Sequence, residues 1–165
     1  DSTGICFIGE RNFTQFLENY LPNIPGDIVN IDTGEILGKH IGLMYYTIGQ
    51  RKGLGMSFHE PKYVISKDSK NNIVTLGSKE DGLVNSLIAE DMNYILYEKP
   101  HTEKAVMART RYSQKEVPAK LIALDDDKAR IVFDNSIAFV APGQSVVLYE
   151  GDSVVGGGII SETQY

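Results

Sequence analysis

Cys6 is the residue best suited to covalent chemistry, because it is the only cysteine among the 165 residues. It lies between Gly4 and Gly9, where the backbone can turn sharply and present the thiol. The thiolate is the reactive form of cysteine, and Arg11 and the N-terminus of a helix expected after it could both stabilise that anion. A single cysteine is nevertheless more often a small buried apolar residue. Composition alone favours this simpler interpretation.

A second candidate is the glycine-rich stretch 49–55, which contains Gln50, Arg51 and Lys52. Its backbone N–H groups could cradle a phosphate. The spacing matches neither a P-loop nor a dinucleotide fingerprint. The alternative is a tight turn with exposed basic residues, and the residues alone support the two interpretations equally.

A third candidate combines Arg111 and Tyr112 with Gln144. Arginine can hold a phosphate through two hydrogen bonds, and tyrosine can stack on an unpaired base. The cations of this region are Arg109, Arg111, Lys115 and Lys120, against Glu116 alone. The simpler interpretations are a strand with alternating exposure for residues 111–112 and a turn residue for Gln144.

The overall charge argues against a nucleic-acid binder, because the chain has a net charge of −6 and phosphate contacts need Lys and Arg. A local basic face on an acidic protein and ordinary solvated charges both remain open.

Three histidines, at positions 40, 59 and 101, lack zinc-ligand spacing, so we expect no metal site. A catalytic pair of Cys6 with His40 has no local signature. Apolar runs are too short for a membrane span, and one cysteine fits a reducing cytosol.

The pattern along the chain predicts a mainly β protein with one helix near the N-terminus. The helix covers residues 12–21, where an apolar stripe recurs at helical spacing and Pro22 ends it. Alternating apolar residues bounded by turn signals favour strands at 27–32, 35–38, 62–66, 73–76, 83–89, 105–111, 119–124, 129–134, 145–149 and 153–159. We expect the seam between two domains within residues 78–93.

Three blocks in the same order resemble the family of tRNA-specific 2-thiouridylases, which place sulfur on the wobble uridine of certain tRNAs. They are residues 1–11 (DSTGICFIGER), residues 42–55 (GLMYYTIGQRKGLG), and a split block of 108–112 (ARTRY), 141–145 (APGQS) and 156–160 (GGGII). The resemblance implies a small central barrel-like domain followed by a C-terminal β-barrel. The implied parts are residues 1–11 as a remnant of the catalytic segment, 12–80 as the central domain and 81–165 as the barrel.

The resemblance also implies roles for individual residues. Cys6 would carry sulfur as a persulfide, received from a sulfur-donor protein and delivered to the tRNA base. Arg11, Gln50, Arg51 and Lys52 would shape the site around it. Arg111, Tyr112 and Gln144 would touch tRNA, with Arg111 on a phosphate.

The family activates the uridine with ATP in an N-terminal domain that carries a Ser-Gly-Gly-x-Asp-Ser type loop and a first catalytic cysteine, and neither occurs in these residues. We therefore expect a C-terminal fragment of a longer cytoplasmic enzyme, inactive alone and without a membrane or metal partner. One alternative is a non-catalytic β-barrel RNA-binding module with an incidental cysteine, and a weaker one is a thiol hydrolase. The sulfur donor, the tRNA species and the oligomeric state stay open.

Overall fold

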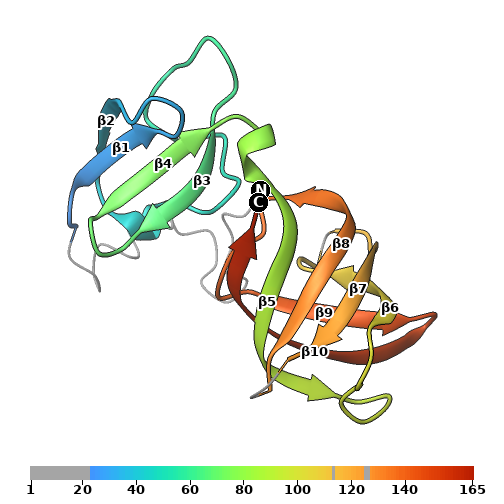
Figure 1. The fold of residues 1–165 in the computed structure, drawn as a ribbon. Helices are drawn as coiled ribbons and strands as arrows, with labels where there is room; N and C mark the ends of the chain where they lie inside the picture. Colours follow the sequence, from blue (N-terminus) through green and yellow to red (C-terminus); the bar gives the residue numbers. More distant parts are fainter. Residues whose placement is uncertain (1–22, 113, 125–126) are drawn as a thin grey trace, which may run out of the picture. The chain divides into compact units, whose positions relative to one another are not determined.

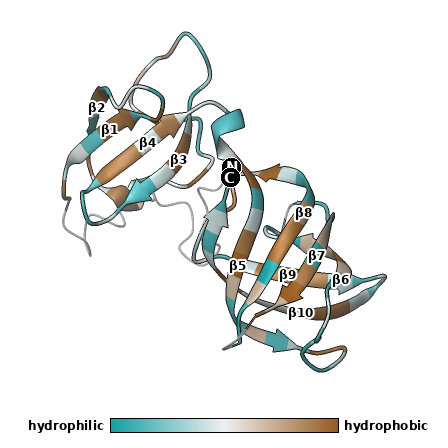
Figure 2. Ribbon diagram, in the orientation of Figure 1, coloured by the Kyte–Doolittle hydropathy of each residue, from teal (hydrophilic) through white to brown (hydrophobic). Residues whose placement is uncertain are grey.

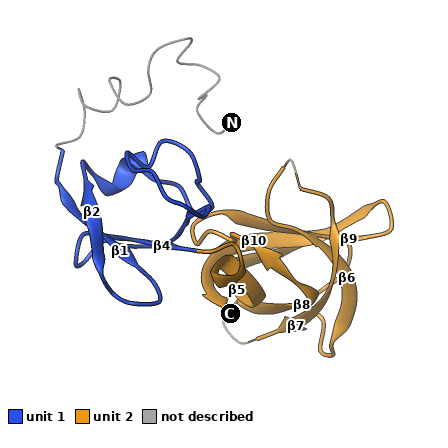
Figure 3. Ribbon diagram, turned by 90° about the horizontal axis from the view of Figure 1, so that it is seen from above, with its two compact units in different colours: residues 1–77 blue, residues 78–165 orange. Residues whose placement is uncertain are grey.

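The computed structural model describes residues 23–112, 114–124 and 127–165. The chain divides into two compact units, residues 1–77 and residues 78–165 (Figure 3). Each of the ten predicted strands has a counterpart, which confirms the mainly β prediction. The helix predicted at 12–21 lies outside the described residues.

The first unit is a four-stranded sheet with the order β2-β1-β4-β3 (Figure 1). Its strands are β1 (Gly26–Asn30), β2 (Ile36–His40), β3 (Tyr63–Asp68) and β4 (Ile73–Gly77), and the 3-10 helix η1 (Leu43–Tyr45) follows β2. The central strands β1 and β4 are parallel, whereas each pairs antiparallel with its outer neighbour. The buried core residues are Ile28, Tyr46, Leu54, Val64, Val74 and Leu76.

The turn between β1 and β2 forms where the sequence predicts it. Gly34 has a left-handed φ of 68°, and its N–H donates to the carbonyl of Asn30 at 2.9 Å. The side chain of Asn30 accepts from the N–H of Asp32 at 2.9 Å. Because glycine adopts positive φ without a steric penalty, the residues at this turn specify the hairpin directly.

The second unit is a closed barrel of six strands, paired in the order β10-β5-β8-β7-β6-β9. After the 3-10 helix η2 (Glu80–Gly82) come β5 (Leu83–Tyr94), β6 (Lys104–Arg109), β7 (Val117–Ala123), β8 (Ala129–Ala138), β9 (Ser145–Glu150) and β10 (Ser153–Gln164). The ring closes because β9 pairs with both β6 and β10. Apolar residues concentrate on the strands (Figure 2), and seventeen buried residues fill the interior.

Strands β5, β8 and β10 extend beyond their predicted ends. They continue to Tyr94, Ala138 and Gln164, because register shifts interrupt the pairing but not the strands. One such shift lies between Glu90 and Asn93 in β5, opposite Gly157 and Ile159 of β10. A β-bulge increases the local bend of a strand, which lets a long strand follow the curve of a barrel. A bulge interrupts the alternation of apolar and polar residues, so a prediction based on that alternation underestimates the length of a bulged strand.

Three consecutive glycines in β10 allow close contact with both neighbouring strands. A Cβ on Gly156 would lie 2.2 Å from the carbonyl oxygen of Asn93 in β5, and one on Gly157 would lie 2.6 Å from that of Val146 in β9. A Cβ on Gly158 would lie 2.6 Å from the carbonyl oxygen of Glu90. These contacts are with backbone atoms, which cannot move aside as a flexible side chain can.

We predict that Gly156→Ala destabilises the barrel by about 1–3 kcal/mol, because the added methyl group forces β5 and β10 apart. Amide hydrogen exchange of β5 and β10 measures this loss. Ser153→Ala is the matched control, since this exposed residue of the same strand should change stability by less than about 0.5 kcal/mol. Equal exchange in the two variants would contradict the close-contact explanation.

Candidate functional site

The loop between β6 and β7 is held at its base by side-chain contacts. The guanidinium of Arg109 donates from Nη2 to Oε1 of Glu116 at 2.8 Å across the loop. Inside it, the buried Thr110 hydroxyl donates to Oε1 of Gln114 at 2.8 Å. The N–H of Gln114 donates to the carbonyl of Arg111 at 3.1 Å. Contacts between residues at opposite ends of a short loop restrict the conformation of the described residues that form them.

Tyr112 lies in this loop with 97% of its surface exposed. Such a side chain contributes almost nothing to the core, and nearly all of its ring surface is available to a ligand. The sequence alone suggested strand-like alternation for residues 111–112, but the structure places both after the end of β6 at Arg109. An aromatic ring presented by a restrained loop is suited to stacking on an unpaired base.

Arg111 connects this loop to the one between β8 and β9. Its Nη2 donates to the carbonyl oxygen of Phe139 at 2.5 Å. Partial desolvation of the guanidinium lowers the pKa of Arg111 below its ordinary value, although the residue as a whole remains exposed. The guanidinium is therefore already engaged in a contact between two loops.

Gln144 lies at the end of the β8–β9 loop and is exposed. Its N–H donates to the carbonyl of Ala141 at 3.2 Å, and its own carbonyl accepts from the N–H of Ile160 at 2.8 Å. Gly143, with φ of 85°, completes the turn. Gln144 is thus a turn residue whose side chain the turn leaves exposed.

Strand pairing places these two loops at the same end of the barrel. Strand β6 ends at Arg109, which pairs with Val147 near the start of β9. Strand β8 ends at Ala138, which pairs with Leu83 at the start of β5. Gln144, although distant in sequence from Arg111 and Tyr112, therefore belongs to the same end of the barrel as they do.

The cations between Arg109 and Lys120 do not form an uninterrupted basic face. Lys120 pairs with Glu103 at 3.0 Å, as Arg109 does with Glu116 at 2.8 Å. Sequence reasoning counted Glu116 alone because Glu103 is distant in the chain. The antiparallel pairing of Lys104 with Leu121 brings Glu103 beside β7.

The glycine-rich stretch is a tight loop attached to β3. Gly49 donates its N–H to the carbonyl of Val64 at 2.8 Å, and Val64 donates back to the carbonyl of Gln50 at 3.0 Å. The Gln50 side chain accepts from the N–H of Thr47 at 3.0 Å and donates to the carbonyl of Lys52 at 3.0 Å. The N–H groups of Gly49 and Gln50 are used within the protein, the latter in a hydrogen bond to the carbonyl of Thr47 at 2.9 Å, so these two are not available to a phosphate. Of its predicted site residues, Arg51 and Lys52 are exposed, whereas Gln50 holds the loop together.

Cys6 and Arg11 lie outside the described residues, so their proximity to the other predicted residues stays a prediction. Among the described residues, no group of three or more His, Cys, Asp or Glu could hold a metal ion. In the same residues no helix is long and apolar enough to cross a membrane.

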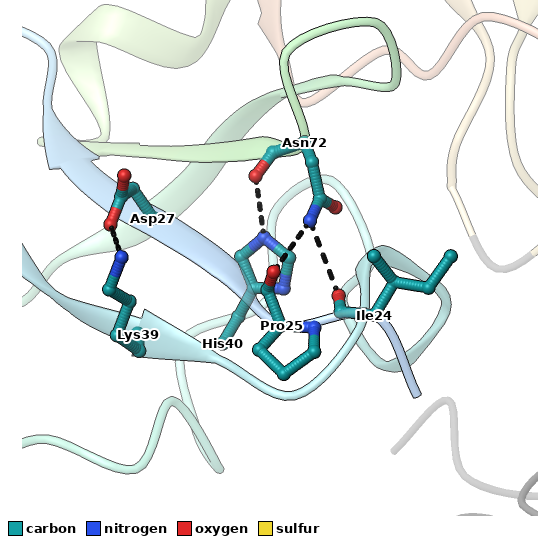
Figure 4. A network of polar contacts seen from close by, with 6 residues as sticks. All are labelled: Ile24, Pro25, Asp27, Lys39, His40 and Asn72. Carbon is teal, nitrogen blue, oxygen red and sulfur yellow. Dashed lines mark hydrogen bonds and ion pairs between the residues drawn. The ribbon is translucent and has the colours of Figure 1, made fainter. Parts of the chain in front are cut away.

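Sequence reasoning missed a buried polar network in the first unit (Figure 4). His40 is only 1% exposed, and its Nε2 lies 3.0 Å from the carbonyl oxygen of Asn72. The Asn72 side chain donates to the carbonyls of Ile24 and Pro25, at 3.3 and 2.8 Å. A Cβ on Gly26 would lie 2.0 Å from the carbonyl oxygen of Asn72. The network fixes the entry of the chain into β1, and the only sequence signal is a histidine at the end of an apolar strand.

Comparison with known proteins covers both units. Residues 14–78 match the family described as tRNA methyl transferase PRC-barrel domain, and residues 84–160 match the family described as aminomethyltransferase beta-barrel domain. The tRNA-specific 2-thiouridylase MnmA of Shewanella sp. (strain MR-7) is 45% identical over 98% of this chain and 45% of its own length. The protein of the same name from Mycoplasma mobile is 45% identical over 100% of this chain and 45% of its own length. The protein of the same name from Salmonella arizonae is 46% identical over 98% of this chain and 46% of its own length. The chain thus spans just under half the length of these relatives.

We predict that Glu116→Ala lowers the free energy of unfolding by about 1–2 kcal/mol, because it leaves the half-buried Arg109 without its carboxylate. The measurement is urea denaturation followed by circular dichroism. Glu103→Ala is the matched control, because Glu103, like Glu116, directly precedes a strand. The side chains of Glu103 and Lys120 are both half exposed, so this ion pair should contribute less than about 0.5 kcal/mol to stability. A larger loss in the control would contradict the ranking of the two ion pairs.

Proposed function

Because the chain belongs to the family of tRNA-specific 2-thiouridylases, we propose that it serves, within a longer enzyme, in the transfer of sulfur to the wobble uridine of tRNA in the cytoplasm. The observation that carries this proposal is the 45% identity to such enzymes along essentially the whole chain, both units included. The family resemblance assigns activation of the uridine to ATP. The proposal gives none of the described residues a part in that step.

In this proposal Cys6 carries the sulfur. Its thiolate attacks the outer sulfur of a persulfide on a sulfur-donor protein, a new S–S bond forms on Cys6, and the donor leaves as a thiolate. The outer sulfur of the persulfide then forms a bond to the activated carbon of the uridine, and the adenylated oxygen leaves as AMP. The thiolate of a second cysteine of the longer enzyme attacks the Cys6 sulfur, so the persulfide S–S bond breaks and a disulfide between the two cysteines remains. Arg11, Gln50, Arg51 and Lys52 are proposed to shape the surroundings of Cys6. The exposed side chains of Arg51 and Lys52 support a role that needs positive charge at a surface.

The barrel is proposed to contact tRNA through the two loops at one end. Three features of these loops support that assignment: the exposed ring of Tyr112, the exposed amide of Gln144, and the hydrogen bond through which Arg111 connects them. An anticodon loop offers the unpaired bases that proteins usually read in RNA. Stacking and shape do not require the net positive charge that this chain lacks.

The second candidate function is a non-catalytic RNA-binding module. It shares the barrel-end contacts, which would bind RNA equally well without any thiol. The two candidate functions differ in whether Cys6 takes part in the transfer of sulfur to tRNA.

Replacing Cys6 with serine in the full-length enzyme should abolish thiolation of a tRNA transcript and leave tRNA affinity within about twofold, because a hydroxyl cannot carry a sulfane sulfur. Thiolation is measured as incorporation of labelled sulfur, and affinity by filter binding. Persistence of thiolation in this variant would favour the binding module.

Tyr112→Ala should weaken tRNA binding by about tenfold, equivalent to about 1.4 kcal/mol and within the range of one base–aromatic stack. Tyr112→Phe should bind as the wild type does, because it keeps the ring. Since Tyr112 is almost fully exposed, thermal denaturation should be unchanged in both variants. Equal affinity of the alanine and phenylalanine variants would exclude stacking.

A further inference from the structure

The contact between Arg111 and Phe139 joins two loops that are far apart in the sequence. Arg111 follows β6, whereas Phe139 follows β8, and the Arg111 Nη2 donates to the Phe139 carbonyl oxygen at 2.5 Å. A hydrogen bond from a charged donor is stronger than one between neutral groups. The partial desolvation that lowers the pKa of Arg111 also strengthens this contact, because water competes less for the guanidinium.

Phe139 is itself held in an unusual conformation. Its φ is 61°, in the left-handed region that non-glycine residues adopt only when their surroundings require it. Its N–H donates to the carbonyl of Gly82 at 2.8 Å, in the short helix η2 that precedes β5. The N–H of Phe139 thus bonds to η2, and its carbonyl oxygen bonds to Arg111.

The residues on either side of this contact are the candidate tRNA contacts. Tyr112 is adjacent to Arg111 in sequence, and Gln144 closes the turn that begins after Phe139. Loss of the Arg111 hydrogen bond would therefore allow the two loops to change position independently.

We propose that Arg111 is a positioning residue, which ties the β6–β7 loop to the Phe139 carbonyl and so holds Tyr112 and Gln144 in one arrangement for a single RNA loop. This inference rests on the proposed tRNA contact and differs from the sequence-based expectation for Arg111, a direct phosphate contact. The two roles predict different behaviour in salt. A lost phosphate contact reduces the slope of log affinity against log salt by roughly 0.7–0.9, whereas lost positioning leaves that slope unchanged.

The test compares Arg111→Ala with Lys115→Ala, which removes an exposed cation from the same loop. Two quantities are measured for each: the affinity for an unmodified tRNA transcript over a range of salt, and hydrogen exchange of the amides of Phe139 and Gly143 without RNA. Arg111→Ala should weaken binding about tenfold at an unchanged salt slope and accelerate exchange of the Phe139 amide about tenfold. Lys115→Ala should leave exchange unchanged. Combining Arg111→Ala with Gln144→Ala should weaken binding less than the product of the single effects.

A third variant covers the case in which Arg111→Ala does not fold. Arg111→Lys keeps the charge but is one atom shorter, so it should also accelerate exchange and weaken binding. Wild-type exchange in the lysine variant together with wild-type affinity would overturn the proposal. So would a reduced salt slope with unchanged exchange in Arg111→Ala, because Arg111 would then be a phosphate contact.

Failure of the underlying function gives a different result. If Tyr112→Ala and Gln144→Ala bind tRNA as the wild type does, this end of the barrel does not contact tRNA, and the positioning role for RNA falls with it. If those variants lose affinity but Arg111→Ala does not, the tRNA contact stands and the positioning role alone is overturned.

Discussion

Closure of the six-stranded barrel is the constraint on which the candidate site depends. Strand β9 pairs with both β6 and β10, so the described strands of the second unit form a ring without an open edge, and their antiparallel pairing fixes which loops lie at each end. The glycines at 156–158 let β10 approach both neighbours closely enough to complete the ring. Tyr112 and Gln144 lie at the same end of the barrel as a result of this closure, since they are distant in the sequence.

Much of the fold could be predicted from local pattern, whereas much of the site could not. Alternation and turn residues located all ten strands, and Gly34 specified its turn. The predicted ends of β5, β8 and β10 were too early because bulges break the alternation that the prediction follows. The buried His40 and the Arg111–Phe139 hydrogen bond depend on residues that are 32 and 28 positions apart. Contacts at such separations leave no periodic signal in a single sequence.

The net charge of −6 gives a poor guide to local electrostatics in this chain. Arg109 and Lys120 are neutralised by carboxylates that the β6–β7 pairing brings near, and Arg111 is engaged with a backbone carbonyl. The barrel end thus presents the exposed ring of Tyr112 and the exposed Gln144 beside a single exposed lysine, Lys115, among the described residues of the β6–β7 loop. An RNA surface of this kind favours unpaired, accessible bases over duplex backbone.

The open sheet of the first unit has strand edges at which two molecules could associate, whereas the closed barrel has none among its described strands. Among the described strands, β2 and β3 are outer strands, and the backbone of β3 is already paired at Val64 with the glycine-rich loop. The outer edge of β2 could therefore join a second molecule more readily. Lys39 in β2 places charge on that edge, which discourages such pairing. Ile36 and Ile41 nevertheless remain 60% and 49% exposed at β2 and just after it. Self-association under mild denaturing stress should therefore begin at β2 rather than in the barrel.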